Sequence, residues 1–485
     1  MDAQTIMEIR PALTSYLHEF DGCFANVRSR RHLLTYVAGQ LSDLQRKSIE
    51  PMADAAGVPP RTLQEFLSLT RWDEAAARER LQRRVARRHS HPHSIGVIDE
   101  TSFVKKGSHT ACVQRQHCGA VGKVENCVVS VHLGYVADDF HTLLDGQPYL
   151  PEKTWHDNRA RCRTAGIPDD VLYRSKWRMA LEQYRRALGN GVRFAWLTFD
   201  EGYGGKPPFL RELDGCGQNY VAEIPVSFVG WTVPPAVLQR VLPRDRRLGR
   251  PRKFPRLKVK HTPACQVRDL LKYSPIVRRI PWTAYHVKDG EKGPMVWQAK
   301  CVPFWIKDEN GLPVGPYHLM IARNVLDPAE VKYFLSNAPA AEAVELLLLV
   351  AFSRWRIERM FEDSKGELGL DHFEVRRYGS LCRHLLLTCV SYLFLAEFRQ
   401  RQKKRRSVDD SPGVQGDAGL GEHLAWGRAV FAQAGRIDRG AIGVNATAKR
   451  SRAPRPPQAN DPTITCPRLQ TERIDPMPVA EGVAL

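Results

Sequence analysis

The chain has 485 residues, 43% of them hydrophobic, and carries 72 Lys and Arg against 53 Asp and Glu, a net charge of +19. This length favours about three units of roughly 150 residues each, and the basic balance indicates a polyanionic partner, with nucleic acid first. The eleven cysteines form no CxxC pair, and the longest apolar run, residues 385–396, is too short to span a membrane. Without a signal-peptide pattern at the start, these features exclude disulfide-rich secreted and membrane-spanning proteins and predict a cytosolic chain with reduced thiols.

Residues 1–90 form the first predicted unit and are helical, because apolar positions recur at intervals of three and four. Within them, "IEPMADAAGVPPRTLQEFLSL" (49–69) has the pattern of two short helices around a Gly-containing turn. This pattern is compatible with a helix-turn-helix that enters a major groove, and an ordinary helical hairpin explains it equally well.

Residues 91–222 change to a pattern of strands mixed with helices. In "SIGVIDETSF" the four positions before Asp99 are apolar or Gly, so a buried strand delivers an acid near its end. Strand alternation sends Asp99 and Glu100 to opposite faces, so only one of them faces a shared site. "AWLTFDEGYGG" repeats the arrangement with Asp200. A carboxylate that caps a loop or a helix start would explain either acid alone.

Residues 223–335 are proline-rich and strand-like, and Asn310-Gly311 in "IKDENGLPV" predicts a hairpin. The segment 244–260 is strongly basic. Its "GRPR" sequence, with Arg250 and Arg252, is typical of an extended segment that lies in an A·T-rich minor groove. A solvated basic loop explains these arginines equally well.

Residues 336–403 return to a helical pattern, and residues 404–485 lose periodicity and are expected to be disordered. One helix is predicted to begin with the apolar "AVELLLLVAFS" and to continue into "RWRIERMFEDSKGELGLDHFEVR" (354–376). On that helix Arg354 and Lys365 fall within about 40° of Glu358. An ordinary pair of Arg and Glu four residues apart is the alternative to a functional stripe.

The three acids Asp99, Asp200 and Glu358 make chemical sense together. Converging carboxylates repel one another unless a cation lies between them, and ligands that offer only oxygen favour Mg²⁺ or Mn²⁺. Two such ions about 4 Å apart activate a water or hydroxyl nucleophile and stabilise the leaving oxygen in an in-line phosphoryl displacement. That reaction acts on nucleic acid, in agreement with the charge balance.

These motifs resemble the DDE transposases of bacterial insertion sequences. The stretch "RWRIERMFEDSKGELGLDHFEVR" is similar to the signature of the insertion-sequence-701 group, which is related to the insertion-sequence-4 group, and the resemblance covers about residues 20–400. It implies an α/β fold with a ribonuclease-H-like mixed sheet core, a β-rich insertion and an N-terminal helical domain. The implied ranges are 1–90 for a DNA-binding domain, 91–222 and 336–403 for the two halves of the core, 223–335 for the insertion and 404–485 for a tail.

The resemblance also implies roles for individual residues. Asp99, Asp200 and Glu358 would be catalytic and hold two Mg²⁺ or Mn²⁺ ions, with Glu362, one turn further on, as the alternative to Glu358. Arg354 and Lys365 would contact DNA phosphates near the cut. Trp297 and Trp305 are candidates for stacking on a flipped base, although tryptophans in strands are more often core residues. The related signature has a Tyr where this chain has Ala351, which puts the role of that Tyr in doubt.

We therefore expect a transposase that binds the terminal inverted repeats of its own element, cuts by metal-dependent hydrolysis and joins the freed 3′ hydroxyl to target DNA. Pairing two DNA ends implies a homodimer in the DNA complex, with no membrane involved and a cytoplasmic, nucleoid-associated location. The alternatives are a DNA-binding regulator, or a domesticated transposase, in which the acids are structural. Glycoside hydrolysis by paired carboxylates leaves the charge of +19 unexplained.

Overall fold

The computed structural model of the protein describes residues 3–239, 254–259, 262–290 and 293–409, all in one compact unit. Its helices are α1 (Ala3–His18), η1 (Asp21–Cys23), α2 (Val27–Gln40), α3 (Ile49–Ala55), α4 (Pro60–Ser68), α5 (Glu74–Arg88), η2 (Glu152–His156), α6 (Arg159–Thr164), α7 (Lys176–Gly189), α8 (Glu201–Gly204), α9 (Pro207–Gly215), α10 (Val267–Tyr273), α11 (Pro275–Arg279), α12 (Val344–Phe352), α13 (Trp355–Leu368) and α14 (Tyr378–Asp409). Its strands are β1 (Ile95–Val104), β2 (Gln114–Cys118), β3 (Lys123–Ala137), β4 (Phe140–Pro148), β5 (Trp196–Phe199), β6 (Tyr220–Glu223), β7 (Val229–Trp231), β8 (Val237–Leu238), β9 (Arg256–Leu257), β10 (Cys265–Gln266), β11 (Thr283–Gly290), β12 (Gly293–Lys307), β13 (Pro313–Asn324) and β14 (Val331–Ser336).

The N-terminal stretch is helical, as its periodicity predicted. Asn26 caps α2 by accepting from the amide of Ser29 at 2.9 Å, and Asp73 caps α5 in the same way. Helices α3 and α4 are joined by a turn in which Gly57 has a φ of +67°, a conformation that favours glycine. The two predicted short helices are therefore confirmed, while a role for them in DNA binding stays a prediction.

A twelve-stranded mixed sheet forms the centre of the fold. Strand β1 pairs antiparallel with β3, which pairs antiparallel with β4, whereas β1, β5 and β6 run parallel to one another. Strand β14 adds to β6, and β13 and β12 extend the sheet further. The predicted hairpin is confirmed, because β12 and β13 flank Asn310-Gly311 and Gly311 has a φ of +75°.

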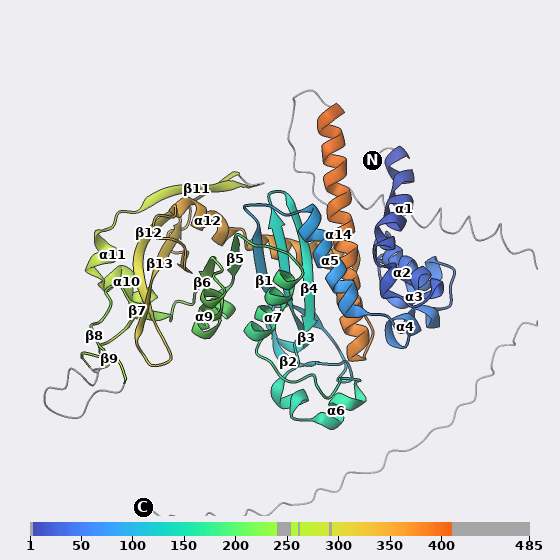
Figure 1. Ribbon diagram of the computed structural model, residues 1–485, viewed down its shortest axis with the longest axis horizontal. Helices are drawn as coiled ribbons and strands as arrows, with labels where there is room; N and C mark the ends of the chain where they lie inside the picture. Colours follow the sequence, from blue (N-terminus) through green and yellow to red (C-terminus); the bar gives the residue numbers. More distant parts are fainter. Residues whose placement is uncertain (1–2, 240–253, 260–261, 291–292, 410–485) are drawn as a thin grey trace, which may run out of the picture. The chain divides into compact units, whose positions relative to one another are not determined.

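Helices cover both faces of the part of the sheet around β1 (Figure 1). Helix α7 packs on β3, whereas α13 packs on β1 and α14 packs on β4. Helix α14 also contacts α2, α4 and α5, so it lies between the sheet and helices α2 and α4, whereas α5 packs on β4 as well. It is long and apolar enough to cross a membrane, but 78% of its most apolar window is buried inside the protein, as expected for a core helix.

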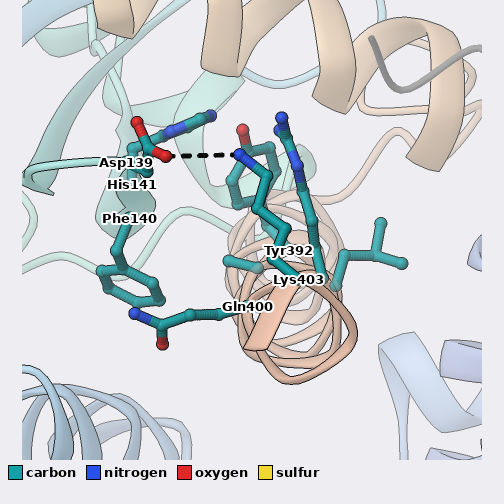
Figure 2. A pocket seen from close by; sticks show the side chains of 9 residues that line it. Asp139, Phe140, His141, Tyr392, Gln400 and Lys403 are labelled. Atoms are coloured by element: carbon teal, nitrogen blue, oxygen red, sulfur yellow. Dashed lines mark hydrogen bonds and ion pairs between the residues drawn. The ribbon is translucent and has the colours of Figure 1, made fainter. Parts of the chain in front are cut away.

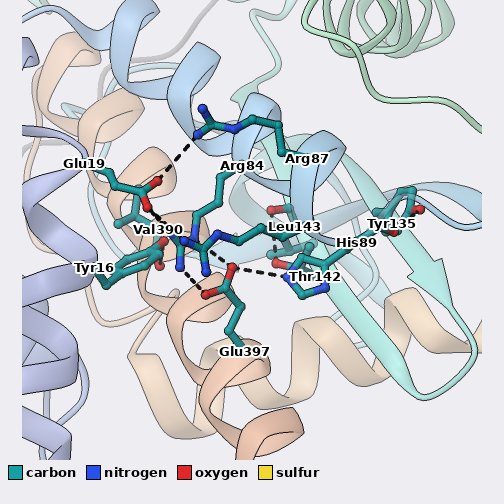
Figure 3. A network of polar contacts seen from close by, with 11 residues as sticks. Tyr16, Glu19, Arg84, Arg87, His89, Tyr135, Thr142, Leu143, Val390 and Glu397 are labelled. Carbon is teal, nitrogen blue, oxygen red and sulfur yellow. Dashed lines mark hydrogen bonds and ion pairs between the residues drawn. The ribbon is translucent and has the colours of Figure 1, made fainter.

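A buried network of charges fastens the N-terminal helices to α14 (Figure 3). Arg84 of α5 donates to Glu397 of α14 at 2.7 and 2.5 Å and also pairs with Glu19, and the side chains of Arg84 and Glu397 are only 5% and 6% exposed. His89 lies 3.2 Å from the same carboxylate. These pairs hold the pKa of Glu397 down to about 2 in spite of its burial, which acts in the opposite direction.

The helix that was predicted to start at the apolar run is in fact two helices. Helix α12 ends at Phe352, and α13 begins at Trp355 after a turn at Ser353 and Arg354. Helix α13 then ends at Leu368, and Gly369 caps it with a φ of +67°. The break places Arg354 in the turn just before α13 instead of inside a continuous helix, so its long side chain extends from the junction of the two helices.

Candidate active site

Three neighbouring parallel strands each deliver an acid at the same level of the sheet. Ile98 of β1 pairs with Phe199 of β5, and Phe199 pairs with Ala222 of β6. The next residue along the chain is in each case an acid: Asp99, Asp200 and Glu223. Because adjacent strands lie about 4.8 Å apart, the three backbone positions form one row across the sheet. We call this set of three residues the acid row.

Asp99 is the most buried member of the acid row. Its side chain is 12% exposed, one oxygen accepts from the amide of Glu100 at 2.7 Å, and Oδ2 accepts from Nη1 of Arg354 at 3.0 Å. Burial and the nearby charge of Asp200 raise the pKa of Asp99 to about 7, although Arg354 acts to lower it. The strand alternation is as predicted, since Asp99 pairs with Arg354 whereas Glu100 pairs with Lys176 of α7.

Asp200 follows β5 directly and caps the short helix α8. Its Oδ1 accepts from the amide of Gly202 at 3.0 Å, so the capping role that could explain this acid alone is present. Burial, followed by the charge of Glu100, raises its pKa, while Arg354 lowers it. The effect of Asp200 on the pKa of Asp99 follows from their neighbouring positions on paired strands.

Arg354 joins the acids of the sheet to the helix. Its Nη2 lies 2.7 Å from Oε1 of Glu358, one turn further on, and its Nε lies 3.6 Å from Oε2 of Glu223. Burial would lower the pKa of Arg354, but Asp99, Glu358, Glu223 and Asp200 together raise it. One guanidinium group is therefore the common counter-charge of Glu358 and the whole acid row.

Helix α13 runs along β1 from Arg354 towards Lys365. The Nζ of Lys365 lies 5.9 Å from the centre of the ring of Phe103, which is on the same face of β1 as Asp99. Burial lowers the pKa of Lys365. Seven residues of helix separate Glu358 from Lys365, about 10 Å, so Lys365 lies beside the site and not in it. Its contact with a DNA phosphate stays a prediction.

The other predicted DNA contacts have different surroundings. Trp297 is 5% exposed and packs 4.7 Å from the ring of Phe352, so stacking on a base would require it to leave the core. Trp305 is half-buried and lies opposite Trp231 on β7. Arg250 and Arg252 lie outside the described residues.

Sequence patterns missed Glu223. A short apolar strand, "YVA", ends in this acid just as the strands before Asp99 and Asp200 end in theirs, so the signal was present but brief. Glu223 pairs with two basic side chains, because Lys332 of β14 donates to Oε1 at 2.8 Å while Arg354 faces Oε2. The backbone of Glu223 is also closely packed, since its carbonyl oxygen lies where a side chain at Gly204 of α8 would be.

The site can be tested for its fit to divalent metal ions. Within the described parts of the chain, no three His, Cys, Asp or Glu side chains are grouped closely enough to hold an ion as they stand. The donor chemistry nevertheless fits, because Asp99, Asp200 and Glu358 offer only oxygen and the charges of all three act on one cationic group, Arg354. Metal ions would have to take the place that the guanidinium now fills.

A separate cavity of about 50 Å³ lies between α14 and the turn from β3 to β4 (Figure 2). Phe140, His141 and Tyr392 line it, and Lys403 pairs with Asp139 at its edge at 3.3 Å. Burial and nearby arginines lower the pKa of His141 to about 4, so this histidine is neutral at physiological pH. None of its lining residues belongs to the acid row, and its small, mostly apolar interior does not suit DNA.

Comparison with known proteins finds similarity to a family of endonucleases. The sequence profile of the DDE superfamily endonucleases matches residues 19–294, more than half of the chain. A protein of Microchaete diplosiphon, named as a probable transposase for insertion sequence element IS701, is 30% identical over 213 residues, which make up 43% of this chain and 52% of the relative. The chain thus matches about half the length of this relative. The profile match includes Asp99 and Asp200 and ends before α13, and its extent shows that the chain belongs to the DDE superfamily endonucleases.

Proposed function

We propose that this DDE superfamily endonuclease is a transposase that binds the terminal inverted repeats of its own element, cleaves there and transfers the freed 3′ end to target DNA. The observation that carries the proposal is that the strand acid Asp99 and the helix acid Glu358 both pair with Arg354, whose pKa the charge of Asp200 also raises. The strand order β4-β3-β1-β5-β6, with β1, β5 and β6 parallel, supports a ribonuclease-H-like core whose insertion continues the sheet from β6.

In this proposal Asp99, Asp200 and Glu358 hold two Mg²⁺ or Mn²⁺ ions. The ions supply activation of a water or 3′ hydroxyl and charge neutralisation at the phosphate. The protein's own part is to keep Asp99 desolvated on a central strand and Asp200 fixed by its helix cap, so that their carboxylates need little reorganisation. Water and a 3′ hydroxyl are equivalent nucleophiles for this displacement, so one site serves both cleavage and strand transfer.

DNA binding would use several surfaces. Helix α4 exposes Arg61 and Gln64 on the side away from its buried Leu63 and Phe66, which suits groove contact by the second helix of a helix-turn-helix. Arg354 and Lys365 would meet phosphates near the cut. Two DNA ends must be paired for transposition, so the active complex would contain at least two chains, and the protein would act in the bacterial cytoplasm at the nucleoid.

Cleavage of the element's own DNA tests the proposal. The protein is incubated with Mg²⁺ and labelled duplexes from the flanks of its gene, beside Asp99→Ala, Glu358→Ala and the matched control Glu362→Ala. Glu362 is on the same helix but 70% exposed and paired with Arg359, so its replacement leaves the site intact. We expect nicks at the repeat boundary with the wild type and the control, and binding without nicks for the two site variants.

The competing hypothesis is a DNA-binding regulator or domesticated transposase whose acids are structural. The capping bond of Asp200 and the pair between Arg354 and Glu358 are the observations that favour it. This hypothesis would replace the transposase proposal if the protein binds the repeats specifically but does not cleave them in Mg²⁺ or Mn²⁺. The Asp99 and Glu358 variants would then bind the repeats as the wild type does.

A further inference from the structure

We propose that Arg354 is an internal counter-ion that competes with the metal ions for Asp99 and Glu358, and that Glu223 is the positioning residue that receives its guanidinium when metal binds. This inference rests on the proposed metal-dependent function. It assigns a role to Glu223, and it changes the role of Arg354 in the absence of DNA from a phosphate contact to an occupant of the catalytic centre.

The oxygens that would bind metal are the ones that Arg354 now holds. Its Nη1 donates to Oδ2 of Asp99 at 3.0 Å, and its Nη2 pairs with Oε1 of Glu358 at 2.7 Å. A divalent ion on the same oxygens would lie within a few ångströms of the guanidinium, and like charges at that distance repel strongly in a partly buried site. The guanidinium must therefore leave at least one of these carboxylates before the ions are fully bound.

Glu223 is placed to accept the guanidinium when it moves away from Asp99. Its Nε already lies 3.6 Å from Oε2 of Glu223, across the acid row from Asp99. Arg354 occupies the turn between α12 and α13, and its side chain is 20% exposed, so a rotation about its own bonds moves the group without moving a helix. A shift towards Glu223 shortens that contact and frees Asp99.

Glu223 is placed to receive a cation and not to act as a metal ligand. Lys332 of β14 donates to its Oε1 at 2.8 Å, which leaves Oε2 directed at Arg354. Both of its oxygens therefore serve cations of the chain itself. Asp99 and Glu358 differ, because Arg354 is the sole cationic side chain that pairs with either of them among the described residues.

Mn²⁺ binding without DNA tests the inference, with free Mn²⁺ measured by electron paramagnetic resonance at about pH 8. We expect Arg354→Gln to bind Mn²⁺ about 10- to 100-fold more tightly than the wild type, since a competing charge near 4 Å is gone. Arg354→Lys should be intermediate, because one ammonium group cannot reach three carboxylates at once. Arg359→Gln is the matched control, since Arg359 lies on the same helix but pairs with Asp363 at 3.1 Å.

Glu223→Gln separates positioning from ligation. It should weaken Mn²⁺ binding about threefold in the wild-type background, because Arg354 then loses the one paired carboxylate that is not a metal ligand in this proposal. It should have no effect in the Arg354→Gln background, where there is no guanidinium to receive. An equal loss in both backgrounds would make Glu223 a ligand and overturn the inference.

Other results separate this inference from the proposed function. If wild type and Arg354→Gln bind Mn²⁺ with the same affinity, competition by Arg354 is refuted while the metal site stands. If neither binds Mn²⁺, and Asp99→Asn changes nothing, the metal-dependent function itself fails. Circular dichroism and thermal unfolding of each variant confirm that the protein compared is folded. A folded variant without Arg354 that binds Mn²⁺ with wild-type affinity counts against the inference.

Discussion

Replacing Asp99 by Asn should stabilise the protein in the absence of metal and DNA, and the gain should grow with pH. The folded pKa of Asp99 is about 7, because burial and the charge of Asp200 disfavour its ionised form. An unfolded Asp titrates near 3.8. The folded chain therefore binds this proton more tightly than the unfolded chain, and ionisation of Asp99 opposes folding as pH rises from about 4 to about 7.

The magnitude follows from the two pKa values. Each pH unit between them is worth about 1.4 kcal/mol, so the ionised carboxylate lowers the free energy of unfolding by about 4 kcal/mol at pH 8 and by about 2 kcal/mol at pH 5. The side chain is 12% exposed, so solvent screens little of this. Asn has nearly the same shape and no charge, and it therefore removes the penalty without leaving a cavity.

Thermal unfolding in EDTA at pH 5, 6, 7 and 8 measures the effect. The transition temperature of Asp99→Asn should exceed that of the wild type by a few degrees at pH 8 and by less at pH 5, since a large chain moves only a degree or two per kcal/mol. Glu362→Gln, which removes an exposed carboxylate from α13, should show no such trend. A destabilised Asp99→Asn at pH 8, or a gain that shrinks as pH rises, would refute this account of the buried charge.

Three further outcomes concern the buried ion pair between α5 and α14 and the close packing beside Glu223. Arg84→Met should lower the free energy of unfolding by about 3–5 kcal/mol, because it leaves the buried Glu397 with His89 in place of its arginine partner, and Arg84→Met with Glu397→Gln should recover most of this in thermal unfolding. With its folded pKa near 2 against 4.5, Glu397 should contribute about 3 kcal/mol that is present above pH 4.5 and lost as pH falls towards 2, a dependence absent from Glu397→Gln in acid titrations. Gly204→Ala puts a Cβ 2.0 Å from the carbonyl oxygen of Glu223, so it should lower the free energy of unfolding by about 1–3 kcal/mol and weaken Mn²⁺ binding. Gly366→Ala on α13 has open space around the new Cβ. It should leave Mn²⁺ binding unchanged and be neutral or slightly stabilising in thermal unfolding.

Much of the fold was predictable because its signals are local. Residues 1–90 were read as helical from apolar spacing, and the hairpin around Asn310-Gly311 from its turn residues, and both are confirmed. The pair between Arg354 and Glu358 was also predictable, since residues four apart on a helix are always neighbours. The break between α12 and α13 was not, because the apolar run before it and the charged run after it both carry helical periodicity.

The sequence by itself determined which acids end a buried strand and which residues share a helix face, because neighbours along the chain settle strand alternation and helical spacing. Only the tertiary structure decided that Asp99, Asp200 and Glu223 stand in one row, since this depends on the register between strands more than a hundred residues apart in the case of β1 and β5. It also decided that Arg354 faces Asp99 and not solvent. Register and helix docking are set by the packing of the whole core, and a single strand or helix carries no record of the partner that will lie beside it.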